Sequence, residues 1–209
     1  MKQYAIGRNN VPLIFGGNLL GVNVTPVDPY NPLGLPPNTV RIQSSDGHPP
    51  NAPQASYDTA TLVAGTSDIY DIYRSGTSFA YLLYYATNVR TVLGANTTGI
   101  TNMSHMFDTC SDLAVVPLFD TSSVTTTEAM FYHCGDLMSI PLFDTSSVVN
   151  MDQMFDSCRM VESGALALYQ QASSQATPPS YHRLTFYDCG ANTVTGREEL
   201  AQIPSGWKY

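Results

Sequence analysis

The protein has 209 residues, 12% of which are charged, and a formal net charge of −8 at pH 7. This length is enough to bury a core of ordinary size, and the negative charge argues against a nucleic-acid-binding surface. No run of about 18 apolar residues occurs, so we expect no membrane-spanning segment. We also expect no signal peptide, because Arg8, Asn9 and Asn10 interrupt the apolar residues near the N-terminus.

Residues 1–37 are predicted to form an extended arm, because Gly, Asn and Pro recur throughout and residues 25–37 are rich in Pro. The alternative is a disordered tail. Six residues make this segment too apolar for solvated disorder: Ile14, Phe15, Leu19, Leu20, Val22 and Val24. We therefore expect the arm to pack against a partner and to anchor the protein to it.

Residues 38–81 contain two strand-like segments, 39–43 and 59–64, separated by a Pro-rich loop at 46–53. The repeats that follow would expose an open edge at their N-terminal end. We therefore predict that residues 38–81 form a small β-rich cap on that edge.

Residues 82–190 repeat with a period of 24. The blocks MFDTCSDLAVVPLFDTSSVTTTEA, from Met106, and MFYHCGDLMSIPLFDTSSVVNMDQ, from Met130, align without a gap. A third block opens at Met154, and a degenerate block begins at Leu82. This period is typical of leucine-rich repeats, so the predicted fold is a short α+β solenoid of about four to five coils with an insertion at 159–181.

Within a coil, three residues are predicted to fill the inward positions of a short strand: Leu137, Ile140 and Leu142. Four more are spaced as on one face of a helical or 3₁₀ segment: Val148, Met151, Met154 and Phe155. We expect this stripe of Met and Phe to belong to the core and not to a ligand site.

The cysteines recur in one position of successive coils, at Cys110, Cys134 and Cys158, whereas the first coil has Ala86 there. Cys189 follows in the same Phe-x-x-Cys context. The position therefore requires a small buried group, which a free cysteine can provide. The spacing matches no zinc motif, so we predict four free thiols.

The chain contains no motif for covalent, phosphate or metalloprotease chemistry, and its four histidines are scattered. The repeated Asp120 and Asp144 precede Thr-Ser-Ser, where an Asp side chain bonds its own backbone in an Asx turn. Asn96 holds the same position in the first coil, which favours such turns over a row of calcium ligands. We therefore expect no enzymatic activity, no cofactor and no metal.

The C-terminal residues break the period. Residues 164–172 are predicted to form a short helix inside the insertion, and Thr195 with Glu198 resembles the capping box of a second helix. Pro204 would end this helix, and Trp207 would cover the apolar face of the last coil. Residues 191–209 are thus predicted to be a C-terminal cap.

The residues between inward strand positions would line the concave face of a solenoid, and they are unusually apolar for a solvated surface. We predict a partner-binding face there, formed by Arg90, Val115, Pro117, Phe119, Met138, Pro141 and Phe143. In an alternative arrangement, Phe119 and Phe143 turn inward at a corner of each coil.

The units MF-x-x-C-x-x-L-x-x-(V/I)-PLFDTSSV resemble the BspA-like leucine-rich repeats of bacterial surface proteins, including the mycoplasma lipoprotein-type repeat family, over residues 82–190. The segments LPPNTVRIQ, LGANTTGITNMSHMF, ALALYQQASSQATPP and CGANTVTGREELAQIPSGW resemble prophage and phage structural proteins of gut bacteria. In those proteins an N-terminal anchor precedes such repeats.

This resemblance implies a virion surface protein, such as a head fibre, a decoration protein or a tail-tip protein, made in the host bacterial cytoplasm and released by lysis. The implied partners are other virion proteins, bound through the arm, and a host surface glycan or protein. It also implies a homo-oligomer in the particle. From the net charge and the lack of a long apolar run, we expect neither a nucleic acid nor a membrane as partner. The few coils offer a small face, which favours decoration over host recognition.

Two other functions remain open. One is a bacterial cell-surface adhesin of the BspA-like type, which would require a signal peptide upstream of this chain. The other is a glycan-active enzyme, but no pair of carboxylates on the predicted face supports it.

Overall fold

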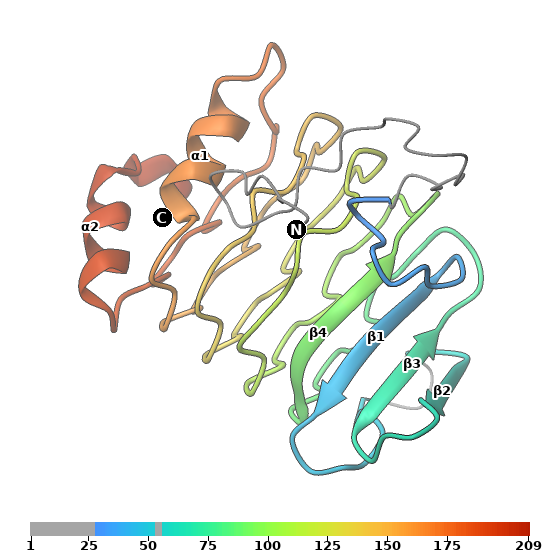
Figure 1. The fold of residues 1–209 in the computed structure, drawn as a ribbon. Coiled ribbons are helices and arrows are strands. Elements are labelled where there is room, and N and C mark those ends of the chain that lie inside the picture. The colour runs from blue at the N-terminus through green and yellow to red at the C-terminus, as the bar shows by residue number, and fades with distance from the viewer. Residues whose placement is uncertain (1–27, 53–55) are drawn as a thin grey trace, which may run out of the picture.

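The computed structural model describes residues 28–52 and 56–209. Its sheet has four antiparallel strands in the order β2-β3-β1-β4, with β1 at Thr39–Ser44, β2 at Thr59–Leu62, β3 at Ile69–Tyr73 and β4 at Val89–Asn96. Because β4 belongs to the first repeat, the sheet connects the N-terminal residues directly to the repeats (Figure 1).

Strand β1 is buried between β3 and β4. Its Val40 and Ile42 are fully buried, as expected where β-branched side chains alternate towards a core. Between them, Arg41 forms a bidentate ion pair with Asp71 of β3, with nitrogen–oxygen distances of 2.7 and 2.8 Å. The sequence predicts β1 and β2 within two residues of their ends but does not predict β3. The strand expected in the first repeat, with Arg90 on its outer face, corresponds to β4.

The repeats stack on one another, and each follows a similar path to the one before it (Figure 1). Isolated parallel bridges connect residues 24 apart, such as Asn102 with Thr126 and Thr126 with Asn150. The bridges continue through Asn150 to Tyr181, across the insertion. The repeat period therefore corresponds to one turn of the chain around the stack.

The prediction of an α+β solenoid of leucine-rich-repeat coils is wrong. The regular secondary structure of the described residues is a small four-stranded antiparallel sheet with two α-helices and a 3₁₀ turn. Between residues 97 and 163 the described chain forms turns and single bridges, with neither a strand nor a helix in each repeat. Pro117 and Pro141 lack an N–H group in the segment where a strand was expected, so a ladder cannot extend through it.

The expected helical segment is replaced by turns because left-handed residues interrupt it. Two residues of each repeat, four positions apart, have φ between 50° and 62°, as at His105 and Thr109 or at Ala129 and His133. Residues other than glycine rarely adopt this region. Backbone hydrogen bonds between repeats compensate for this unfavourable conformation. Phe107 N donates to Met130 O and Phe131 N donates to Met154 O, both at 2.9 Å.

Phenylalanine rings form the centre of the core. Phe131 stacks between Phe107 and Phe155, with centroids 5.3 and 5.2 Å apart, and Phe155 stacks on Phe186 at 6.0 Å. These rings are fully buried. The predicted core stripe of Val148, Met151, Met154 and Phe155 is confirmed, as are Leu137 and Ile140, but Leu142 is 51% exposed and was predicted wrongly.

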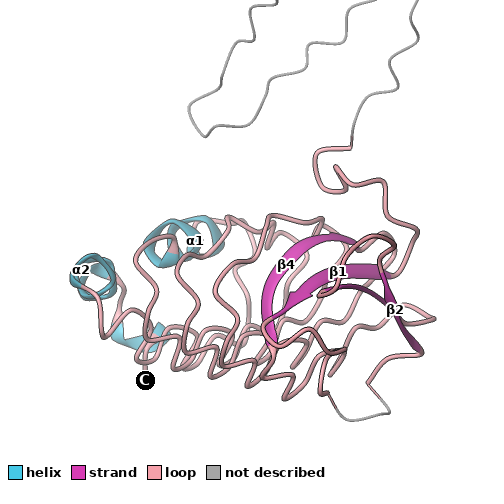
Figure 2. Cartoon of the chain, turned by 60° about the horizontal axis from the view of Figure 1, so that its bottom comes forward, coloured by secondary structure: helices cyan, strands magenta, loops and turns pink. Residues whose placement is uncertain are grey.

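Helices close the C-terminal end of the stack (Figures 1 and 2). Helix α1 spans Ala165–Ser173, which confirms the predicted helix to within one residue, and α2 spans Val194–Gln202. The cap of α2 is Thr193 and not Thr195, because the Thr193 hydroxyl accepts from Gly196 N at 3.0 Å. No helix of the described residues has the length and apolar character that a membrane span requires.

A buried aromatic side chain completes this end. Trp207, in the 3₁₀ turn η1 (Ser205–Trp207), is 6% exposed and lies 6.3 Å from Phe186, ring centre to ring centre. It therefore covers the last ring of the phenylalanine stack, as predicted. Across the helices, Glu199 of α2 accepts from the backbone N of Leu166 at 3.1 Å and satisfies a free amide at the start of α1.

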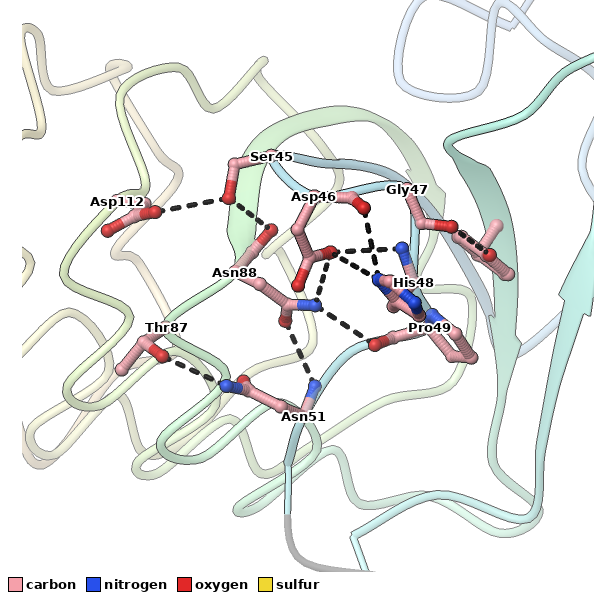
Figure 3. Close-up of polar contacts among 10 residues, drawn as sticks. Ser45, Asp46, Gly47, His48, Pro49, Asn51, Thr87, Asn88 and Asp112 are labelled. Atoms are coloured by element: carbon pink, nitrogen blue, oxygen red, sulfur yellow. Dashed lines mark hydrogen bonds and ion pairs between the residues drawn. The ribbon is translucent and has the colours of Figure 1, made fainter.

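Asn88 fastens the loop after β1 to the first repeat (Figure 3). Its side-chain NH₂ donates to Asp46 and to the carbonyl of Pro49, both at 3.0 Å, while its side-chain oxygen accepts from Asn51 N at 3.0 Å. Asn88 is 6% exposed, so these bonds satisfy an amide that burial removes from water. The bonds from His48 and Asn88 hold the pKa of Asp46 below its usual range.

Candidate partner-binding face

The residues predicted to form a binding face divide into two groups. Val115 and Met138 are 43% and 48% exposed, Arg90 is exposed, and Pro117 and Pro141 are half-buried. The other two point into the core. Phe119 and Phe143 are each 1% exposed and lie 5.0 Å apart, ring centre to ring centre, so their assignment to a binding surface is corrected and the inward alternative is the one observed.

Backbone bonds arrange the exposed residues in rows. Ala114 N donates to Arg90 O at 2.9 Å, Met138 N donates to Ala114 O at 3.2 Å, and Glu162 N donates to Met138 O at 2.8 Å. A cation and a carboxylate thus flank an apolar middle formed by Ala114 and Met138. Val115 belongs to the neighbouring row, where its parallel bridge to Thr91 fixes its position.

A second apolar row was not predicted. Leu118 and Leu142 hold one position of successive repeats and are 42% and 51% exposed. Residues 116 and 119 are both buried, which leaves the two residues between them outside. The spacing of three between buried residues could have predicted that Leu118 is exposed. The expected alternation of a strand, with a spacing of two, predicts otherwise.

Gly94 holds this same position in the first repeat, and the side chain of Leu33 fills the space there. A Cβ atom added at Gly94 would lie only 2.9 Å from Leu33 Cδ1. Leu33 is itself 46% exposed. The row of Leu33, Leu118 and Leu142 therefore starts in the segment that precedes β1.

The turn beside this face is held by its own side chains. Asp120 accepts from Ser122 N at 2.9 Å, Asp144 accepts from Ser146 N at 2.8 Å, and Asn96 accepts from Thr98 N at 3.2 Å. The predicted Asx turns are confirmed. The next residue connects repeats, because Thr97 and Thr121 donate through their hydroxyls to the carbonyls of Asp120 and Asp144.

The predicted small buried position is also confirmed, since Ala86 and all four cysteines are at most 1% exposed. Burial raises the pKa of each thiol well above its usual value. A protonated, buried thiol is a poor nucleophile and a poor metal ligand. Among the described residues, no group of three His, Cys, Asp or Glu side chains is placed to hold a metal ion.

The predicted arm is described only at its base. Its six anchoring residues, Ile14, Phe15, Leu19, Leu20, Val22 and Val24, lie outside the described residues. At the base, Asn31 bonds both backbone groups of Leu35, at 2.8 and 3.0 Å, and Asn96 of β4 donates to Leu35 O at 2.8 Å. Residues 31–35 are thus fixed to the first repeat.

These features define a repeat protein whose stacked turns present side chains in rows. Residues 77–176 match the family model described as Mycoplasma protein of unknown function, DUF285, which is the family that BspA-like mycoplasma repeat proteins carry. The matched range begins after β3 and ends after α1, so it covers most of the repeats. No curated protein and no solved structure gives a significant match to the chain. The resemblance to phage structural proteins has no counterpart in these comparisons.

Proposed function

We propose that this protein is a non-enzymatic binding protein displayed on the surface of a bacteriophage particle, as a head fibre, a decoration protein or a tail-tip protein. Its N-terminal residues attach it to other virion proteins, and its repeats face outward. The assignment to a particle rests on the resemblance of four sequence segments to phage structural proteins. The repeats themselves are supported by the family match at residues 77–176.

The observation that supports the display role is a group of exposed apolar side chains in neighbouring rows. Val115, Met138, Leu118 and Leu142 are each between 42% and 51% exposed on one short stack. Several exposed apolar side chains on neighbouring repeats are typical of a site for a macromolecular partner. The two ends of the stack are covered, by the sheet and by the helices, which leaves its sides for binding.

A deletion tests attachment. Residues 2–27 are removed from the gene in the source strain, and Asn31 and Leu35 are kept because Leu35 is bonded to Asn31 and to Asn96 of β4. Particles are purified after lysis, and the chain is quantified by mass spectrometry in particles and in the soluble lysate. As the control, Leu62→Ala changes an exposed residue of β2.

We expect the full chain and the Leu62→Ala variant in particles, and the deletion variant only in the soluble lysate, with an unchanged thermal unfolding midpoint. A deletion variant that enters particles in full amount would disprove anchoring by the arm. A full-length chain found in the bacterial envelope and not in particles would instead support the alternative, a cell-surface adhesin of the BspA-like type.

A further inference from the structure

The left-handed turns bring a set of aromatic side chains to one edge of the stack. Tyr85 N donates to Asp108 O at 2.8 Å, Thr109 N donates to Tyr132 O at 2.7 Å, and His133 N donates to Asp156 O at 2.9 Å. These bonds align the corresponding turns of four repeats. We call the following residues the turn-edge strip: Tyr81, Tyr84, Tyr85, His105, Tyr132 and His133.

One ring pair of the strip stacks across two repeats, and the other pairs form within a repeat. Tyr81 stacks on His105 with centroids 4.6 Å apart and an angle of 5° between planes, although the two residues are 24 positions apart. Tyr84 meets Tyr81 and Tyr85 edge to face, at 5.4 and 4.6 Å. Tyr132 stacks on His133 at 4.2 Å. The rings thereby hold each other in place before any ligand binds.

Much of this aromatic surface remains accessible to solvent. Tyr81 and Tyr85 are 48% and 50% exposed, and His133 is exposed. Tyrosine combines a large apolar ring with a polar tip, and only two torsions must be fixed on binding. The strip therefore offers preorganised, accessible aromatic surface together with hydroxyl and imidazole groups.

Carboxylates alternate with tyrosines along the strip. Asp108 and Asp156 hold the position that Tyr84 and Tyr132 hold in the neighbouring repeats. Asp108 accepts from the Thr109 hydroxyl and pairs with His105 Nδ1, both at 2.7 Å. Burial, and then the nearby carboxylates, raise the pKa of Tyr84 and Tyr132, so both phenols remain hydrogen-bond donors at neutral pH.

The composition of the strip discriminates between ligand classes. The strip occupies three positions of each repeat, those of Tyr81, Tyr84 and Tyr85 in the first. In the four repeats from Tyr81 to Ser157, these positions contain no Lys or Arg, so a nucleic acid or an acidic polysaccharide would find no counter-charge. They contain no exposed aliphatic side chain either, in contrast to the rows around Leu118 and Met138. Ring faces combined with hydroxyl, imidazole and carboxylate groups fit a ligand with C–H faces and many hydroxyls.

The spacing fits a chain-like ligand. The stacked core rings of successive repeats lie 5.3 and 5.2 Å apart, which is close to the length of one pyranose unit in an extended polysaccharide. A saccharide chain that runs along the strip would therefore meet one turn with each sugar unit. We propose that the turn-edge strip is a binding site for a neutral polysaccharide, with one sugar unit at the turn of Tyr81 and Tyr85 and the following units at the turns of His105 and His133. This deepens the proposed function and rests on it for its biological role.

The test uses the purified full chain. Its mobility is measured in native gels that contain soluble β-glucan, galactomannan or xylan, and in gels with polygalacturonate as the acidic probe. Neutral and acidic oligosaccharides on a printed array extend the range of sugars. The variants are Tyr81→Ala, Tyr85→Ala and Tyr85→Phe, and the control is Tyr181→Ala, which removes a tyrosine that is 59% exposed and lies outside the strip.

We expect retardation by at least one neutral polysaccharide, and a loss of affinity of about tenfold in Tyr85→Ala, as for the loss of one aromatic contact. Tyr85→Phe should keep most of the affinity, and Tyr181→Ala should keep all of it. The proposal is overturned if no neutral glycan binds, if only polygalacturonate binds, or if Tyr81→Ala and Tyr85→Ala bind as tightly as the native chain. Particle attachment does not enter this test, so its failure is distinct from failure of the proposed display role.

Discussion

The thiol of Cys134 donates a hydrogen bond to the backbone carbonyl of Phe107, with 3.0 Å between sulfur and oxygen. The same bond connects Cys110 to Leu83 and Cys158 to Phe131, always to a residue 27 positions earlier. A bond of this kind contributes little free energy by itself. In these three repeats the thiol is a second donor to a buried carbonyl that already accepts a backbone N–H, as Phe107 O does from Cys110 N at 3.0 Å.

The thiols should therefore be free but unreactive in the folded protein. Alkylation without reductant in denaturant is expected to give four adducts by mass, and alkylation of the folded protein at neutral pH should give almost none. The physical reason is that burial both excludes the reagent and raises the pKa of the thiols. Fewer than four adducts in denaturant would reveal a disulfide and refute this prediction.

The phenylalanine stack should dominate the stability of the repeats. Phe131→Ala is expected to lower the free energy of unfolding by about 3–5 kcal/mol, because it removes a fully buried ring between two others. Leu142→Ala, at an exposed position of the same repeat, should change it by less than about 0.5 kcal/mol. Urea unfolding followed by circular dichroism measures both, and similar losses in the two variants would contradict the proposed core.

Asn88 should contribute to stability by holding the loop after β1 against the first repeat. Asn88→Ala leaves Asn51 N and the carbonyl of Pro49 without their partner, so we expect a loss of about 1–3 kcal/mol. Asn192→Ala, at an exposed position, is the control and should be nearly neutral. The two variants would unfold alike if the loop after β1 were attached by other contacts.

Gly164 should tolerate no side chain. Its φ is 101°, and an added Cβ would lie 2.2 Å from the carbonyl oxygen of Ile140. Gly164→Ala is expected to cost at least about 1–3 kcal/mol from backbone strain alone. Gly135 has open space around it and no unusual φ, so Gly135→Ala should be neutral or slightly stabilising. Thermal unfolding compares the two variants. Equal midpoints would contradict the close approach of Gly164 to the carbonyl of Ile140.

Asp156 should give the stability a characteristic pH dependence. Burial, more than any other cause, raises its pKa above the ordinary 3.8. Between 3.8 and the raised value the folded state binds more protons than the unfolded state, so this group makes stability fall as the pH rises. Asp156→Asn should flatten that slope. Urea unfolding at a series of pH values tests this, and identical slopes in both proteins would refute it.

The buried residues could be predicted from the sequence because apolar residues recur in it with a fixed period. Met154 and Phe155 are predicted to be buried from their spacing along one face, and Cys134 from its recurring position. The small position at Ala86 and the Asx turn at Asp120 were likewise predictable, because each depends on local chemistry within one repeat.

The path of the chain between these residues could not be predicted. Left-handed turns at His105 and Thr109 have no marker in the sequence, since glycine occupies neither position. They form because backbone groups of adjacent repeats bond across them, which is a tertiary effect. The turn-edge strip escaped the sequence analysis for the same reason: Tyr81 and His105 differ in type, and only the aligned turns bring them together.

Cryo-electron microscopy of particles purified from the lysed source strain is the most direct test of the display role. The account predicts density for the four-stranded sheet and the stacked turns on the particle surface, joined to a neighbouring virion protein by the residues that precede Asp28. Intact particles without this density, together with the chain in the bacterial envelope, would contradict the account.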